Sequence, residues 1–127
     1  MITENLLDST FGHDVKDWGK AKEEAQAVLM DTARAQSTIS YGELARRISS
    51  VRFDPHGDDF RHFLGQLSWE ADIAGRGMIT VLVVHAGGDC KPGNGFFRLA
   101  KHLGRDTSDP DICWITELQR VYSDYAR

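Results

Sequence analysis

The feature that most constrains this chain is an unbroken apolar run, residues 79–84, which ends at His85. A strand that is apolar at nearly every position is covered on both faces, so we expect it at the centre of a core. A glycine-rich segment follows over residues 87–95 and contains Cys90 and Lys91. Turns beside buried strands often hold functional residues, so this junction is a first candidate site.

Helical periodicity predicts three helices before this strand. The first is capped by Asp14 and runs to about residue 35. Ser40 and Glu43 have the spacing of a capping box, which starts a short helix that ends near residue 49. After a loop over residues 50–57, Gly57 or Asp58 caps a longer helix that ends near residue 74. Its expected buried stripe is Phe60, Phe63, Leu64, Leu67 and Ile73.

Two helices are expected after the strand. Residues 96–103 form the first, which Gly104 ends. Ser108 or Asp109 caps the second, with Pro110 at its first position. The apolar stripe of this last helix is predicted to be Ile112, Ile115, Leu118, Val121, Tyr122 and Tyr125.

This order predicts one α+β domain over residues 1–127, mostly helical and of the winged helix-turn-helix type, with a small β-ribbon. In that fold the second helix of the pair enters the DNA major groove, and the ribbon contacts the backbone or the minor groove. The second strand of the ribbon is expected at residues 89–91 or 95–97. The connection over residues 50–57 is longer than the usual tight turn.

The composition bears on three classes of function: nucleic-acid binding, metal binding and membrane association. The net charge of −4 argues against a strongly basic nucleic-acid binder, yet residues 46–105 hold nine basic and six acidic side chains. Such a segment is either a local positive face or an ordinary solvated surface. Cys90 and Cys113 form no CxxC pair, so we expect free thiols, no metal site and no cofactor. No apolar run could cross a membrane, and no signal segment is evident, so we expect a cytoplasmic protein without a membrane partner.

The leading hypothesis is a non-enzymatic binding module, with double-stranded DNA as the candidate partner. Arg61, His62 and Gln66 are expected on the outward face of the second helix, where arginine and glutamine can read base edges. Phosphate contacts are expected from Lys91 and from a pair of arginines in the short helix. Asp58 and Asp59 at the start of the second helix would repel phosphates. The full candidate set for nucleic acid is Arg46, Arg47, Arg61, Gln66, Arg76 and Lys91.

Two alternatives come from other function classes. A small enzyme would use His85 as a general base together with Glu70, and Cys90 beside Lys91 as a reactive thiol. The structural interpretations are a strand-end histidine bonded to the turn, a carboxylate paired with Arg76, and an inert thiol. A protein-interaction or dimerisation module would instead use the aromatic side chains of the last helix: Trp114, Tyr122 and Tyr125.

Two resemblances bear on these hypotheses. The segments LGQLSWE, GRGMITVLVVHAGG, KPGNGFFRLAKHLG and WITELQRVYSDY resemble a family of small uncharacterised bacterial proteins. Residues 39–45, ISYGELA, resemble the (V/I)(T/S)YGE(I/L)A segment in the winged-helix DNA-binding domain of alkylguanine alkyltransferases and alkyltransferase-like proteins. That likeness implies the fold, but the Pro-Cys-His-Arg motif of those enzymes is absent, because the strand here ends Val84-His85-Ala86. Alkyl transfer is therefore not expected.

Overall fold

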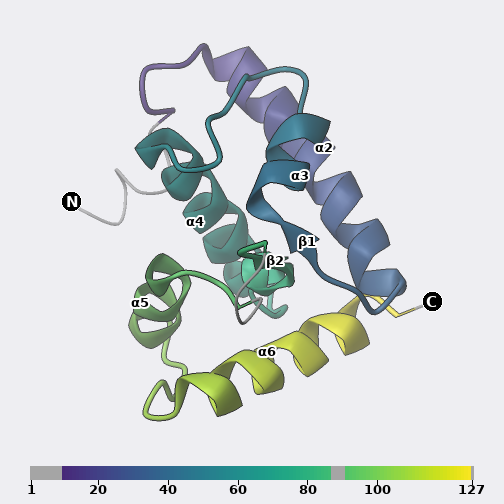
Figure 1. The fold of residues 1–127 in the computed structure, drawn as a ribbon, viewed down its shortest axis with the longest axis vertical. Helices are drawn as coiled ribbons and strands as arrows, with labels where there is room; N and C mark the ends of the chain where they lie inside the picture. Colours follow the sequence, from purple (N-terminus) through teal and green to yellow (C-terminus); the bar gives the residue numbers. More distant parts are fainter. Residues whose placement is uncertain (1–9, 87–90, 127) are drawn as a thin grey trace.

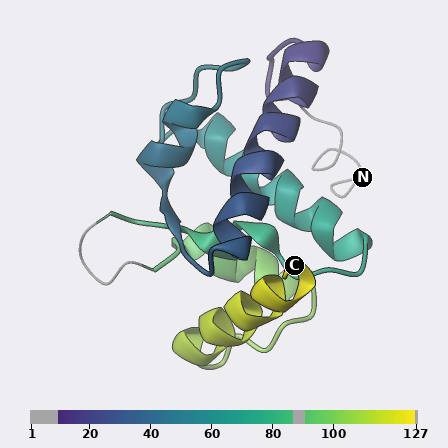
Figure 2. The same cartoon turned by 90° about the vertical axis from the view of Figure 1, so that its right-hand side faces the viewer.

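The computed structural model describes residues 10–86 and 91–126. This part of the chain is mostly helical, with one two-stranded sheet, as expected for an α+β fold. Figures 1 and 2 show α2, α3 and α4 on one side of the short sheet, and α5 and α6 on the other. The elements in order are α2 (Val15–Arg34), β1 (Ile39–Ser40), α3 (Tyr41–Arg47), α4 (Asp58–Ile73), the 3-10 helix η1 (Ile79–Leu82), β2 (Val83–Val84), α5 (Asn94–His102) and α6 (Pro110–Asp124).

The central apolar run is buried as predicted, but it is not a long strand. Residues Ile79–Leu82 form η1, and only Val83–Val84 pair in parallel with β1. β1 offers just two residues, so the ladder cannot extend further. Helices α2, α4 and α6 all contact η1 and enclose it, which explains a run that is apolar at nearly every position.

The predicted ribbon of a winged helix is not found in the described residues. Residues 89–90 lie outside them, and residues 95–97 belong to α5 instead of a strand. The partner of β2 is β1, which precedes α3, with Ile39 opposite Val83. The loop after β2 is closed at its base by a hydrogen bond from the His85 backbone N to Lys91 O (3.0 Å).

Local capping signals placed the helix starts correctly. The Asp14 carboxylate accepts hydrogen bonds from two backbone amides in the first turn of α2, and the Ser40 hydroxyl accepts from the Glu43 amide (3.1 Å). Asp109 caps α6, whose first residue is Pro110. The first residues of α2, α3 and α6 therefore lie within one or two residues of the predicted helix starts.

Two predicted stripes differ from the structure. Ile73, at the last residue of α4, is exposed. On α6, Ile112 and Ile115 are 62% and 47% exposed. The buried stripe of α6 advances in steps of four and comprises Cys113, Glu117, Val121 and, just past the helix end, Tyr125. Because Glu117 is part of this stripe, a search for apolar residues at helical spacing does not find it. No described helix has the length and hydropathy needed to span a bilayer.

Candidate functional site: an arginine–histidine cleft

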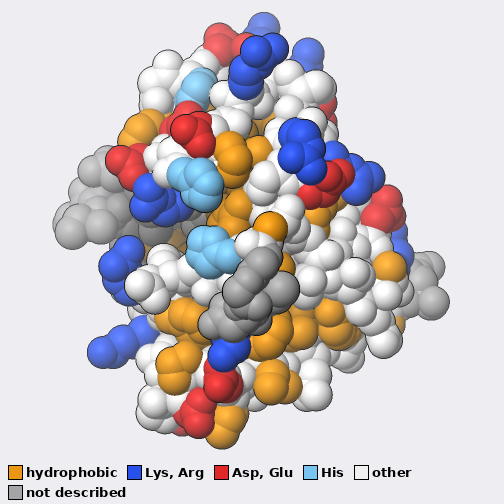
Figure 3. Space-filling model, viewed as in Figure 1, with side chains coloured by type: hydrophobic (Ala, Val, Ile, Leu, Met, Phe, Trp, Pro, Cys, Tyr) orange, Lys and Arg blue, Asp and Glu red, His pale blue; other side chains and the backbone are white. Residues whose placement is uncertain are grey.

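A cleft of about 600 Å³ opens between the first half of α4 and the first half of α5. The start of α3, Thr80 of η1 and the residue after β2 complete its walls. Figure 3 shows histidine side chains near the middle of this face of the molecule, with arginine and lysine side chains at several places around them, including the left edge. We call it the arginine–histidine cleft after its characteristic lining residues, which with one tyrosine are Tyr41, His56, Arg61, His62, His85 and Arg98.

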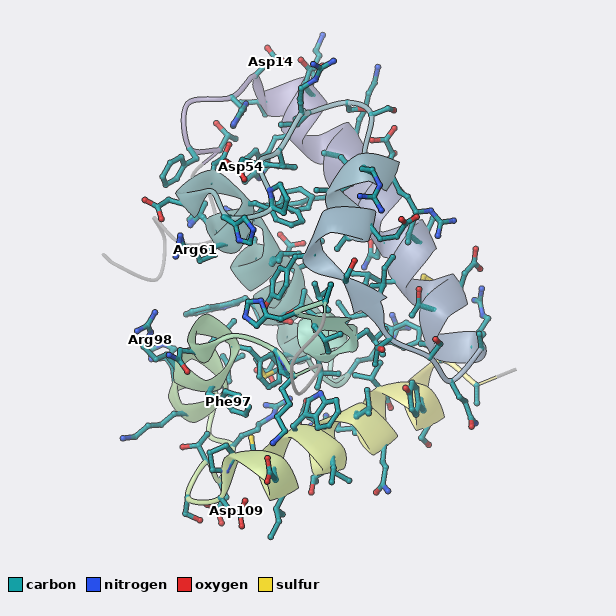
Figure 4. All side chains as sticks on the ribbon, in the orientation of Figure 1. Asp14, Asp54, Arg61, Phe97, Arg98 and Asp109 are labelled. Carbon is teal, nitrogen blue, oxygen red and sulfur yellow. The ribbon has the colours of Figure 1, made fainter. Side chains whose placement is uncertain are left out.

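The charged side chains that line the cleft are arginines. Among the described residues that line it there is no aspartate or glutamate. Arg61 stands at one edge, where it pairs with Asp58 (3.0 Å) and donates to the His56 carbonyl (2.9 Å). Arg98 is exposed on α5 and forms no ion pair with any described residue. Figure 4 shows these two arginines on the same side of the molecule, one from α4 and one from α5.

The short sheet brings Tyr41 and His85 together. The parallel register pairs Ser40 with Val84, so the next residue of each segment lies alongside the other. Their ring centroids are 4.8 Å apart. The Tyr41 hydroxyl accepts a hydrogen bond from the Gly93 amide (3.0 Å), which ties α3 to the start of α5. Burial raises the pKa of the Tyr41 hydroxyl, so it stays protonated at neutral pH.

Space at Gly93 is tight. A Cβ there would lie 3.2 Å from His85 Nε2 and 3.4 Å from the Tyr41 hydroxyl oxygen. Gly93 is also the N-cap of α5, and it offers no side chain to bond the first-turn amides. Gly93, Asn94 and Gly95 all line the cleft, so the partial positive charge of the helix N-terminus adds to that of the arginines.

The structure corrects the expected position of Gln66. Its side chain is fully buried and does not lie on the outward face of α4. It accepts a hydrogen bond from Trp18 Nε1 (2.7 Å) and contacts His62 Nε2 (3.1 Å). The stretch of α4 from Gln66 to Trp69 is buried, so within the cleft it is the first two turns of α4 that face a ligand.

The other basic candidates lie elsewhere. Arg46 pairs with Glu43 and, like Arg47, is exposed on α3. Arg76 lies over the ring of Tyr125 (5.6 Å), and Lys91 pairs with Asp111. Of the six residues predicted to touch nucleic acid, the structure places Arg61 alone among the described lining residues of the cleft.

The catalytic candidates are not brought together in the described part of the chain. His85 lies in the cleft, whereas Glu70 pairs with Lys22 of α2 (2.6 Å) and not with Arg76 or His85. Cys90 lies outside the described residues. Within the described ranges, no group of three histidine, cysteine or acidic side chains could hold a metal ion.

Sequence reasoning missed Tyr41, His56 and Arg98 as site residues. Tyr41 follows the helix-capping Ser40, and Arg98 lies one turn after the start of α5. Neither position carries a sequence signal of its own, because the cleft exists only once α3, α4 and α5 pack together. Comparisons with protein-family models, with curated proteins and with solved structures found no match to this chain.

Proposed function

We propose that this chain is a non-enzymatic module that binds nucleic acid through the arginine–histidine cleft. The observation that carries the proposal is a concave surface with two arginines, three histidines and an uncapped helix N-terminus, without a carboxylate among its described lining residues. Such a surface attracts a polyanion even when the net charge of the protein is negative. The adjacent rings of Tyr41 and His85 add a surface on which a base can stack.

The acidic start of α4 is compatible with this proposal. Asp58 pairs with Arg61, and Asp59 pairs with His13 (2.9 Å), so both carboxylates already have cationic or hydrogen-bonding partners. The repulsion that these two side chains would exert on phosphates is therefore reduced. We include in the proposal a winged-helix relationship, with α3 and α4 as the helix pair, and a cytoplasmic location. The sequence resemblance of residues 39–45 supports that relationship.

Fluorescence anisotropy with labelled single-stranded and duplex DNA tests the proposal. We expect binding at low salt that weakens as salt rises, and we expect Arg98→Ala to weaken it further. Loss of one phosphate contact reduces the slope of log affinity against log salt by about 0.7 for a single strand and about 0.9 for a duplex. Arg47→Ala is the matched control, because it removes the same charge from an exposed position outside the cleft.

The outcomes separate two binding modes. Weaker binding in Arg98→Ala with normal binding in Arg47→Ala supports the cleft. The reverse pattern would place phosphate contacts on α3, where the sequence predicts them for Arg46 and Arg47. Absence of binding at micromolar protein, or affinity that does not depend on salt, refutes nucleic-acid binding altogether.

A protein-interaction surface on α6 is a second candidate, favoured by the exposed side chains Ile112 and Ile115. The aromatic residues first considered for this role serve the fold instead. Trp114 Nε1 donates to Val81 O (3.3 Å), Tyr122 donates to Ser37 O (3.0 Å), and Tyr125 is buried. Light scattering across a dilution series tests self-association. A constant monomer mass would remove the dimer version of this candidate.

A further inference from the structure

The segment before α2 forms a tight and strained turn, residues 10–13. Phe11 has φ 53° and Gly12 has φ 85°, so two consecutive residues adopt the left-handed region. Phe11 adopts it without the freedom of glycine, which a chain tolerates only where surrounding contacts hold the residue. Two hydrogen bonds close the turn: His13 N to Thr10 O (3.0 Å) and Thr10 Oγ1 to His13 O (2.7 Å).

His13 docks this turn against both α2 and α4. Its Nε2 atom lies 2.9 Å from a carboxylate oxygen of Asp59, in the first turn of α4. Its ring stacks on Trp18 of α2 (centroids 5.5 Å apart) and meets the edge of Phe53 (5.9 Å). Figure 1 shows this stretch of chain passing beside the beginning of α4.

The same turn reaches a wall of the arginine–histidine cleft. The Phe11 ring packs against the ring of His62 (5.7 Å), and His62 is one of the residues that line the cleft. Phe11 is still 50% exposed, so its packing on His62 is not part of the main core. The contact therefore joins the turn to the ligand-binding surface.

His62 also contacts a hydrogen-bond chain that begins in the core. The indole Nε1–H of Trp18 can only donate, so the atom of Gln66 that it meets must be the carbonyl oxygen Oε1. The Gln66 amide nitrogen is then the atom that faces His62 Nε2 (3.1 Å), and it donates. In this contact Nε2 of His62 faces the Gln66 amide nitrogen, so the contact sets the orientation of the His62 ring.

His62 is thus held by Phe11 of the turn and by Gln66, whose partner Trp18 is stacked on His13 of the same turn. We propose that residues 10–13 act as a strap that positions His62 in the cleft, so that ligand binding and docking of the strap stabilise each other. This inference rests on the proposed function, because it concerns the affinity of the same cleft. The coupling is reciprocal: whatever the strap adds to ligand affinity, the ligand adds to strap docking.

The test measures binding of a labelled oligothymidylate by anisotropy to Phe11→Ala. We expect an affinity about three- to tenfold lower than that of the unmodified chain, the range expected when one side chain is no longer fixed in advance. Phe11→Tyr, which keeps the ring, should restore the affinity. Val15→Ala is the matched control, because Val15 is 73% exposed in the adjacent first turn of α2 and should bind normally.

A second readout tests the reciprocal effect. Amide hydrogen exchange at His13 should slow when the oligothymidylate is added to the unmodified chain, and should not respond in His62→Ala. Should Phe11→Ala fail to fold, as judged by circular dichroism, His13→Asn replaces it and should weaken binding in the same way.

The failures of the two proposals are distinguishable. Normal affinity in Phe11→Ala, alongside weakened binding in His62→Ala and Arg98→Ala, overturns the strap and leaves the cleft in place. Normal affinity in all three variants means that the cleft is not the binding site, and both proposals fall.

Discussion

Glu117 provides the most demanding test of how this fold is held together. It is a carboxylate on the buried stripe of α6, with a side chain only 4% exposed. Its oxygens accept from the Met78 amide (2.7 Å) and from Arg105 Nε (3.1 Å) and Nη2 (2.9 Å). Arg105 also pairs with Asp72 of α4. The group therefore joins α6, the loop after α5, the end of α4 and the residue that starts η1.

Replacing Glu117 with alanine should be strongly destabilising. The substitution leaves the Arg105 guanidinium, 14% exposed, with Asp72 as its one remaining carboxylate, and it removes the acceptor of the buried Met78 amide. Hydrogen bonds to Glu117, and less strongly to Asp72, hold the pKa of Arg105 above its usual range against the opposing effect of burial. A guanidinium stays protonated in proteins, so Arg105 cannot respond to the loss of Glu117 by losing its charge. Breaking a buried ion pair on one side costs about 3 to 5 kcal/mol. For a chain of this size that is a fall of about 10 to 20 °C in melting temperature.

Urea unfolding followed by circular dichroism measures this change in the free energy of unfolding. Gln119→Ala is the control, because Gln119 is exposed on the same helix. The double variant Arg105→Met, Glu117→Leu should recover only part of the loss: it removes the partly unpaired guanidinium, but it leaves Asp72 without Arg105 and the Met78 amide without its acceptor. A loss below about 0.5 kcal/mol in Glu117→Ala, the usual range for surface substitutions, would refute the view that this network anchors α6.

Three further predictions concern single positions. Gly65→Ala should raise the free energy of unfolding by about 0.5 to 1 kcal/mol, because alanine favours a helix and a Cβ at this position meets no atom within 4 Å. The same substitution should weaken ligand binding, because Gly65 lines the cleft. Unchanged affinity would show that the ligand does not contact this part of the wall. Asp14→Ala should cost about 1 kcal/mol in urea unfolding through loss of the α2 cap. The Ser49 hydroxyl and the Ser50 amide donate hydrogen bonds to Glu24 and lower the pKa of its carboxyl group. The stability that these bonds add to the folded state is therefore complete above about pH 4.3 and is lost as the pH falls through the lowered pKa. In an acid titration, the free energy of unfolding of Glu24→Gln should fall less steeply than that of the unmodified chain.

The parts of the fold that the sequence predicted well depend on contacts within one turn of chain. Asp14, Ser40 and Asp109 cap helices through amides two or three residues away, so composition and spacing suffice to find them. Burial of residues 79–84 was also predictable, because an apolar run of that length has no solvent-facing side. Whether the run becomes a strand was not, since its pairing depends on a partner segment about forty residues earlier.

The errors in predicted burial on α4 and α6 share one physical cause. In each case a polar side chain is buried in the core, where it forms hydrogen bonds with other parts of the fold. Gln66 was placed on a surface because amides are usually exposed, yet the Trp18 indole and His62 provide its partners. Glu117 on α6 was not predicted to be buried for the same reason, and Ile112 and Ile115, which are exposed, were included in the predicted buried stripe instead. A buried polar residue is identified by its partners, and these come from other elements of the fold.

The same argument explains why the cleft could be predicted only in part. Arg61 and His85 could be predicted from recognisable elements, because Arg61 lies on the outward face of an amphipathic helix and His85 follows a buried apolar run. Their relation to Tyr41 and Arg98 depends on the two-residue parallel ladder and on the hydrogen bond from the Gly93 amide to Tyr41. That bond and the closed base of the loop after β2 fix where α5 begins, and so place its uncapped N-terminus in the cleft. His85 therefore contributes through two parts: its backbone N–H closes the loop, while its side chain packs on Tyr41 and lines the cleft.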